Sequence, residues 1–163
     1  IAISLIAGAP IEAVRGVLTS FHGVEHRLEF VTMKNNVRYY NDSKATNAQA
    51  AITALTAFHN PLIWIGGGLD REVDFKELVP VLREHVRAAI VYGQTAPIMA
   101  ERAKDAGITT IVQATDVTDA VYQASKIAVA GDTVVLSPAC ASWDQYTSFE
   151  ERGSIFKQAV HTL

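Results

Sequence analysis

Apolar and polar positions alternate along the chain with two periods, one typical of strands and one typical of helices. Short apolar runs after residue 27 are separated by longer stretches in which apolar residues recur every three or four positions. The expected strands span residues 28–33, 37–40, 62–65, 88–92, 109–112 and 133–136, and the expected helices span 47–58, 75–85, 96–106, 116–130 and a segment from 149 onward. Strands that alternate with helices join through right-handed crossovers. The pattern therefore predicts an α/β fold: a Rossmann-like, mostly parallel sheet with an N-terminal antiparallel hairpin and helices on both faces.

The start of the chain differs from the rest. The apolar pattern of residues 1 to about 22 predicts two short helices, the second of which begins at Pro10. Two short helices do not enclose a core, so we expect residues 1–25 to be the tail of a preceding domain with its linker, Phe21–Arg27. Residues 26–163 are expected to form the main domain. Because no initiator Met and no basic segment precede the first apolar run, we expect a chain cut within a helix rather than a signal peptide.

The composition restricts the classes of partner. Fourteen basic and 17 acidic residues give a formal net charge of −3 with no basic cluster, which argues against nucleic-acid binding. No apolar run approaches the roughly 18 residues that span a bilayer, so we expect no membrane segment. The single cysteine, Cys140, indicates a reducing compartment, the cytoplasm. Its alanine neighbours indicate a packed thiol rather than a nucleophile, and the five histidines lack metal-ligand spacing, so we expect no metal ligands in this chain.

The loops that follow the strands carry the candidate chemistry. In parallel crossovers these loops share the carboxyl edge of the sheet, where open α/β sheets bind ligands. Four of them contain polar or glycine-rich sequence: residues 41–47, 66–71, 92–95 and 137–146. The last is dense in small and hydroxyl residues and leads to Ser148 and Glu151, whose spacing predicts a capping box. The aromatic residues of this stretch either join the core or wall a pocket.

The loop at 41–47 allows two interpretations. Asp42 at a strand end can accept hydrogen bonds from the vicinal hydroxyls of a ribose, and Lys44 supplies a flexible cation for phosphate. Thr46 and Asn47 precede a helix whose free amides favour an anion. Alternatively, the same residues only form a turn and cap that helix. A lysine beside a helix N-terminus opposes the macrodipole, which favours an anion nearby.

A glycine run follows the next expected strand. Gly66, Gly67 and Gly68 suggest a dinucleotide site, but Arg71 stands where the fingerprint GxGxxG requires its last glycine. We interpret the run as a tight turn that lets Arg71 point into the cleft, with a solvated surface arginine as the alternative. The chain contains no Walker motif, so it does not hold triphosphate and magnesium in the P-loop manner by itself.

Three segments together resemble the C-terminal region of the Mur ligases. They are Gly23–Glu29 (GVEHRLE), Asn41–Asn47 (NDSKATN), and Ser137–Ser142 (SPACAS) followed by Asp144-Gln145 and Phe149–Gly153 (FEERG). The resemblance covers nearly the whole chain, with residues 1 to about 25 matching the end of the family's central ATPase domain. It points to the D-glutamate-adding branch, because other branches typically carry His or Asn followed by Pro after the aspartate.

The resemblance implies an ATP-dependent acid–D-amino-acid ligase of peptidoglycan synthesis, and thus a role in cell wall biogenesis, cell shape and cell division. Such an enzyme adds D-glutamate to UDP-N-acetylmuramoyl-L-alanine through an acyl phosphate. By position, Arg27 and Asp42 would bind the nucleotide, with Asp42 on the ribose, and Lys44 would be the catalytic cation that faces the phosphoryl group. The D-glutamate pocket would comprise Thr46, Arg71, Ser142, the Trp143 amide and Phe149.

The chain also departs from the family's pattern. Arg71 stands where relatives often carry Lys, and Trp143 replaces a more usual Leu or Phe. The P-loop, magnesium ligands, modified lysine and UDP-binding domain are absent from this sequence, so ATP and Mg²⁺ would be held mainly by a missing central domain. We therefore expect the fragment alone to be inactive. Two alternatives stay open: an unrelated dinucleotide-binding domain, and a nucleotide-binding Rossmann-like module without ligase activity.

Overall fold

The structure of the chain is a computed structural model that describes residues 1–21 and 23–163. Its helices are α1 (Ala2–Ile6), α2 (Ile11–Ser20), α3 (Ala48–Leu55), α4 (Val79–His85), α5 (Ala96–Asp105), α6 (Val117–Ile127) and α7 (Phe149–Thr162), with a 3-10 turn, η1 (Lys76–Leu78), before α4. Its strands are β1 (Glu29–Lys34), β2 (Val37–Asn41), β3 (Leu62–Gly67), β4 (Val86–Tyr92), β5 (Thr110–Gln113) and β6 (Thr133–Leu136). Each expected strand is present with ends that differ by a few residues, and so is each expected helix apart from the segment 75–85.

All six strands form one sheet in the order β1-β2-β6-β3-β4-β5. The hairpin of β1 and β2 is antiparallel, and every other neighbouring pair is parallel. The two central strands, β6 and β3, are buried along their whole length. Strands covered on both faces are apolar throughout, which explains the unbroken apolar runs of the sequence. The predicted fold class is confirmed.

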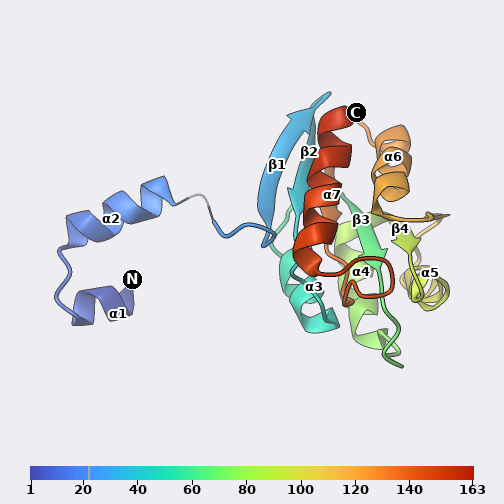
Figure 1. Cartoon of the computed structure of the whole chain (residues 1–163), viewed down its shortest axis with the longest axis horizontal. Helices are drawn as coiled ribbons and strands as arrows, with labels where there is room; N and C mark the ends of the chain where they lie inside the picture. The colour runs from blue at the N-terminus through green and yellow to red at the C-terminus, as the bar shows by residue number, and fades with distance from the viewer. Residues whose placement is uncertain (22) are drawn as a thin grey trace.

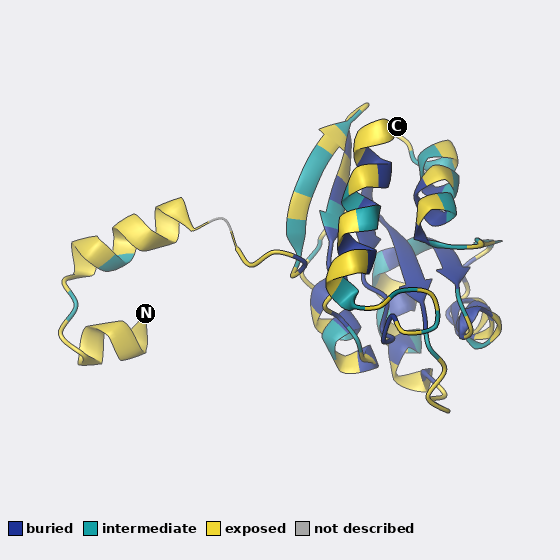
Figure 2. Cartoon of the chain, in the orientation of Figure 1, coloured by how far each residue is buried: buried dark blue, intermediate teal, exposed yellow. Residues whose placement is uncertain are grey.

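Helices cover both faces of the sheet (Figure 1). α3, α4 and α5 contribute to one core, where Trp64 is fully buried, and α6 and α7 contribute to the other, which contains Ile65. Successive strand side chains point to opposite faces, so neighbouring residues of β3 supply both cores. Figure 2 shows the buried strands enclosed between the helices.

Two expected elements need correction. The segment expected as one helix from 75 to 85 instead comprises η1 and α4. Phe75 precedes η1 with a left-handed backbone (φ 54°), so it is not part of a helix. Pro80 lies in the first turn of α4 and has no N–H to donate to the preceding turn, so a continuous α-helix through 76–85 would lack a backbone hydrogen bond there. The glycine run is not a tight turn, because Gly66 and Gly67 continue β3. A Cβ on Gly66 would lie 2.2 Å from the Trp64 ring, and one on Gly67 would lie 2.0 Å from the Tyr92 carbonyl oxygen. Glycine at these positions serves close packing.

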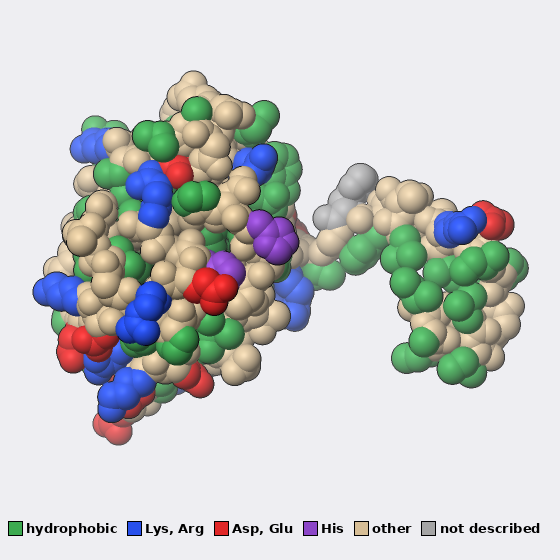
Figure 3. All heavy atoms as spheres, turned by 180° about the vertical axis from the view of Figure 1, so that it is seen from behind, with side chains coloured by type: hydrophobic (Ala, Val, Ile, Leu, Met, Phe, Trp, Pro, Cys, Tyr) green, Lys and Arg blue, Asp and Glu red, His purple; other side chains and the backbone are tan. Residues whose placement is uncertain are grey.

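The N-terminal helices have no buried residues. α1 and α2 lie apart from the sheet in Figure 1, and Figure 3 shows hydrophobic side chains gathered on them. The predicted linker 21–27 includes His22, which lies outside the described residues. The last part of this linker is an ordered turn, because Val24 and Arg27 form an antiparallel bridge and His26 is buried. Among the described residues, no helix is long and apolar enough to cross a membrane.

Candidate functional site at the carboxyl edge of the sheet

The loops after β2 and β6 lie side by side because these two strands are parallel neighbours. Asn41 pairs with Leu136 in the last register position, so residues 42–47 and 137–146 leave the sheet at the same level. The Asp42 backbone N–H donates to the Leu136 carbonyl oxygen (2.7 Å). The juxtaposition expected from parallel crossovers is therefore present.

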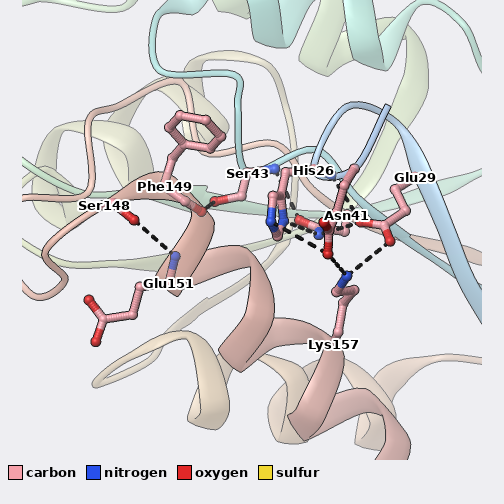
Figure 4. A network of polar contacts seen from close by, with 9 residues as sticks. His26, Glu29, Asn41, Ser43, Ser148, Phe149, Glu151 and Lys157 are labelled. Carbon is pink, nitrogen blue, oxygen red and sulfur yellow. Dashed lines mark hydrogen bonds and ion pairs between the residues drawn. The ribbon is translucent and has the colours of Figure 1, made fainter. Parts of the chain in front are cut away.

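Arg152 of α7 connects these two loops through hydrogen bonds. Its guanidinium is fully buried and donates to the Ser43 hydroxyl (2.9 Å), the Ser43 carbonyl oxygen (2.8 Å) and the Cys140 carbonyl oxygen (3.0 Å). The Ser43 hydroxyl in turn donates to the Phe149 carbonyl oxygen (2.7 Å), at the start of α7 (Figure 4). Arginine offers five donors in a fixed fork, which suits a position where several oxygens converge. One buried side chain thus fixes the relative position of both loops and the helix.

Asp42 is nearly buried and both of its carboxylate oxygens already have protein partners. Oδ1 accepts from the Leu28 backbone N–H (3.1 Å), and Oδ2 accepts from the Ser137 hydroxyl (2.8 Å). Burial raises the pKa of the Asp42 carboxyl, although these hydrogen bonds and the nearby Arg27 charge act in the opposite direction. A carboxylate offers about four acceptor positions, so each oxygen retains one for a ligand hydroxyl.

Lys44 is exposed, and its ammonium lies 4.3 Å from the centre of the Phe149 ring. The Lys44 backbone N–H donates to the His26 carbonyl oxygen (3.0 Å), which anchors the residue to the segment before β1. A cation over an aromatic face is held weakly, by about 0.5–1 kcal/mol at an exposed site. The ammonium is therefore oriented but remains available to an anion.

Two cavities flank the loop 42–47. One, of about 220 Å³, is lined by Asp42, Lys44 and Arg27 together with Leu28 and residues of α3. The other, of about 360 Å³, is lined by Thr46, Arg71 and residues 139–141 together with the start of α3. The predicted nucleotide residues therefore share the first cavity, and two predicted D-glutamate residues share the second.

The other three predicted D-glutamate residues do not line the second cavity. Ser142 is buried, Trp143 is 65% exposed with the Arg71 guanidinium 5.1 Å from its ring, and Phe149 packs with Lys44 instead. Arg71 itself is exposed, as the surface alternative expected. Its guanidinium nevertheless lies beside the Trp143 ring, a contact that guanidinium groups favour.

Several residues were assigned structural roles from sequence. Asn47 caps α3 by accepting from the Ala50 backbone N–H (2.9 Å). Ser148 caps α7 by accepting from the Glu151 backbone N–H (3.1 Å), but the Glu151 carboxylate accepts from Thr147 rather than Ser148, so the capping box is only half formed. Cys140 is packed, and burial raises the pKa of its thiol to about 11, which disfavours the thiolate that a nucleophile requires.

The structure also uses residues that the sequence reasoning did not assign. They are His26 and Asn41, buried beside the Arg27 turn, Ser137 beneath Asp42, and Arg152. Each belongs to one of the quoted motifs, and Arg152 is a charged residue directly followed by Gly153 in a helix. Glycine inside a helix is a signal of close packing, and a Cβ on Gly153 would meet His26.

The cavity beside Asp42 fits part of a nucleotide. It presents a carboxylate with free acceptor positions and two cationic side chains, Arg27 and Lys44, which suit ribose hydroxyls and phosphate. Asp42 is the one carboxylate among its lining residues, so any further magnesium ligands would have to come from outside this cavity. Glu25, His26 and Glu29 also lie close together, but the Lys157 ammonium binds both of these carboxylates.

Comparison with known proteins agrees with this arrangement. The sequence family described as "Mur ligase, glutamate ligase domain" matches residues 26–140. The UDP-N-acetylmuramoylalanine–D-glutamate ligases of Bacillus mycoides (strain KBAB4) and Bacillus subtilis (strain 168) are 50% and 49% identical over 161 and 163 residues. The alignments cover 99% and 100% of this chain and 36% of each relative, so the chain spans about a third of their length.

Solved structures show the same fold. The UDP-N-acetylmuramate–alanine ligase MurC of Thermotoga maritima superposes with a TM-score of 0.68 at 12% identity, over 99% of this chain and 36% of that protein. The MurF ligase of Thermotoga maritima in complex with ADP superposes with a TM-score of 0.62 at 17% identity, over 99% and 36%. The family match also removes the alternative of an unrelated dinucleotide-binding domain. The chain belongs to the Mur ligase family and contains its glutamate ligase domain.

Proposed function

We propose that this chain supplies the D-glutamate pocket and part of the ATP site of an enzyme that joins D-glutamate to UDP-N-acetylmuramoyl-L-alanine. The support is its identity of about half to ligases with that name, together with the site geometry. Residues 1–25 then belong to the end of the preceding central domain, with their hydrophobic side chains packed there. That domain also contributes the magnesium ligands and most of the triphosphate contacts.

The observation that carries the proposal is that one short loop borders two cavities of different chemistry. Asp42 and Lys44 face the cavity with Arg27, and Thr46 faces the cavity with Arg71. A ligase that couples ATP to amide formation must bring a phosphoryl group and an amine to the same carbonyl carbon. A loop with nucleotide contacts at one end and amino-acid contacts at the other meets this requirement over a few residues.

The chemistry asks the protein for position and charge rather than for a nucleophile. ATP converts the substrate carboxylate into an acyl phosphate with release of ADP, and the D-glutamate amine then attacks the carbonyl carbon and displaces phosphate. Negative charge develops on the transferred phosphoryl group and on the tetrahedral intermediate, and oriented cations stabilise such charge. The Lys44 ammonium, exposed at the border of the nucleotide cavity and oriented by Phe149, has this role.

The amino-acid side requires cations and donors for two carboxylates. Arg71 supplies a bidentate fork, Thr46 a hydroxyl, and the backbone around residues 139–142 supplies amides at the rim. Trp143 contacts Arg71 from outside the cavity. Ser142 and Phe149 complete the pocket if the neighbouring domain closes over this edge when substrates bind.

The test uses the complete enzyme and a coupled assay for D-glutamate-dependent ADP release. Lys44→Ala should lower kcat by at least tenfold, about 1.4 kcal/mol, because it removes a charge needed most in the transition state. Lys104→Ala, at an exposed position of α5, is the matched control and should leave kcat unchanged. The 163-residue chain alone should show no turnover. Normal kcat in Lys44→Ala would leave only the turn-forming role for this loop.

A further inference from the structure

Arg27 sits in a turn whose backbone is left-handed on both sides. His26 has φ 63° and Leu28 has φ 44°, values that cost energy for residues other than glycine. Three hydrogen bonds hold the turn. The Arg27 N–H donates to the Val24 carbonyl oxygen (3.0 Å), the His26 N–H to the Glu29 carboxylate (3.0 Å) and the Leu28 N–H to the Asp42 carboxylate (3.1 Å). Strained backbone persists only where surrounding groups fix it, which directs attention to those groups.

Asn41 stands at the centre of those groups and is fully buried. Its side-chain oxygen accepts from the Ser43 backbone N–H (3.1 Å), and its side-chain nitrogen donates to the Glu29 carboxylate (2.9 Å) (Figure 4). A backbone N–H can only donate and a carboxylate can only accept. Burial acts to raise the pKa of Glu29, but hydrogen bonds from the His26 N–H, Lys157 and Asn41 keep it below its ordinary value, so Glu29 is charged at neutral pH. The orientation of the Asn41 amide is therefore fixed by its partners.

This orientation determines the state of the His26 ring. The Asn41 side-chain nitrogen lies 2.9 Å from His26 Nδ1, and because that nitrogen can only donate, Nδ1 must accept. The ring is then neutral with its proton on Nε2. The charged groups around it are Glu25, whose carboxylate is 3.8 Å from Nε2, Glu29, and Lys157, which pairs with both carboxylates.

The ring is also confined from the side of α7. A Cβ on Gly153 would lie 2.2 Å from His26 Nδ1 and 3.1 Å from the Asn41 side-chain nitrogen. The Phe149 ring meets the imidazole edge to face with centroids 6.1 Å apart. The absence of a side chain at Gly153 thus makes room for the hydrogen bond between His26 and Asn41.

We propose that Asn41 is a positioning residue that holds His26 as the neutral Nε2–H tautomer and thereby fixes the turn that presents Arg27. The same turn also locates Lys44, whose backbone N–H donates to the His26 carbonyl oxygen (3.0 Å). The assignment of Arg27 and Lys44 to the nucleotide rests on the proposed function, whereas the tautomer and the turn do not. The proposal is therefore testable in the 163-residue chain without any ligase assay.

The first measurement is a ring ¹⁵N–¹H correlation spectrum of the uniformly ¹⁵N-labelled chain at neutral pH, with the His26 signals identified by their loss in His26→Gln. One pair of well separated ¹⁵N shifts is expected, with Nδ1 at the position of an unprotonated ring nitrogen and Nε2 at that of an N–H. A proton on Nδ1, or shifts averaged between the two tautomers, would overturn the proposal. This arm needs only the unaltered chain and His26→Gln.

The second measurement compares Asn41→Asp with Asn36→Asp, which makes the same change at an exposed hairpin position with left-handed backbone. A carboxylate beside Nδ1 favours a proton there, so Asn41→Asp should move both ring nitrogens to the converged shifts of imidazolium. The backbone amide signals of Arg27, Leu28 and Lys44 should move with them. Asn36→Asp should leave all of these signals in place. Unmoved ring signals, or unmoved Arg27 and Leu28 amides, in Asn41→Asp would refute the positioning role.

Discussion

The Arg152 guanidinium donates to both the hydroxyl and the carbonyl oxygen of Ser43, at 2.9 and 2.8 Å, although 109 positions separate the two residues in the chain. The contact joins the helix after β6 to the loop after β2. A third hydrogen bond reaches the Cys140 carbonyl oxygen, so the same side chain also supports the loop after β6. The two loops that border both cavities are therefore joined by a buried charge that lines neither cavity.

Removing this guanidinium should destabilise the fold. Arg152→Ala leaves the Ser43 and Cys140 carbonyl oxygens without their donor, and hydrogen bonds to charged groups contribute about 1.5–3 kcal/mol each. We expect the free energy of unfolding of the 163-residue chain to fall by about 3 kcal/mol or more, measured by urea denaturation. Arg152→Lys should recover little, because one ammonium does not reproduce the fork.

The control for this change is Arg83→Ala, an exposed arginine of α4 with one hydrogen bond to a carbonyl oxygen. It should alter the free energy of unfolding by no more than about 0.5 kcal/mol. Equal stability of Arg152→Ala and Arg83→Ala would show that Arg152 does not hold the loops together.

The sequence predicted the fold well because the apolar runs of β3 and β6 and the periodic helices carry a strong local signal. The topology then brought the loops at 41–47 and 137–146 together, and Asp42 and Lys44 do line one cavity. The resemblance to the family, rather than spacing, supplied the grouping of the D-glutamate residues. Of those residues, Thr46 and Arg71 line one cavity, and Phe149 lies against Lys44.

The contacts that fix the site were not predictable from periodicity. Arg152 bonds Ser43, and His26 meets Asn41, across separations that depend on the packing of α7 against the hairpin. Local patterns also failed at the glycine run, because a glycine that continues a strand and one that turns the chain look alike in sequence. Only the neighbouring Trp64 ring and Tyr92 backbone show why Gly66 and Gly67 carry no side chains.

In the complete enzyme, Asp42→Ala should raise the apparent KM for ATP more than the KM for D-glutamate. The carboxylate lines the cavity with Arg27 and is expected to accept from ribose hydroxyls. Loss of a charge-assisted contact of about 1.4 kcal/mol corresponds to a tenfold rise in the apparent KM for ATP. Steady-state kinetics with each substrate varied would check this. A larger rise in the KM for D-glutamate than for ATP would reverse the assignment of the two cavities.

At the opposite edge of the sheet, Asp132 should make stability depend on pH. Burial acts to raise the pKa of its carboxyl, but hydrogen bonds from Arg87 and the Val129 N–H, with the Arg87 charge, keep the pKa below its ordinary value. A lowered folded-state pKa stabilises the fold above the unfolded value of about 3.9, and this stabilisation is lost as the pH falls through the folded pKa. Asp132→Asn should therefore cost about 2 kcal/mol at pH 7 and progressively less below about pH 4.

Urea denaturation of Asp132→Asn and the unaltered chain between pH 7 and pH 3 would measure this difference. Glu12→Gln, at an exposed surface pair of α2, is the control and should show almost no effect at either pH. A stability difference for Asp132→Asn that stays constant as the pH falls would contradict the role of the ionised carboxylate.

The central claim is that this domain binds D-glutamate beside Arg71, and steady-state kinetics of the complete enzyme with varied D-glutamate tests it most directly. Arg71→Ala should raise the KM for D-glutamate at least tenfold, about 1.4 kcal/mol, with the KM for ATP unchanged, because it removes a cation that pairs with a substrate carboxylate. Arg71→Lys should recover part of that loss, since it keeps the charge without the fork. Arg83→Ala serves as the exposed control and should match the unaltered enzyme. If Arg71→Ala and Arg83→Ala gave the same KM for D-glutamate as the unaltered enzyme, Arg71 would be a surface residue and the proposed pocket would be wrong.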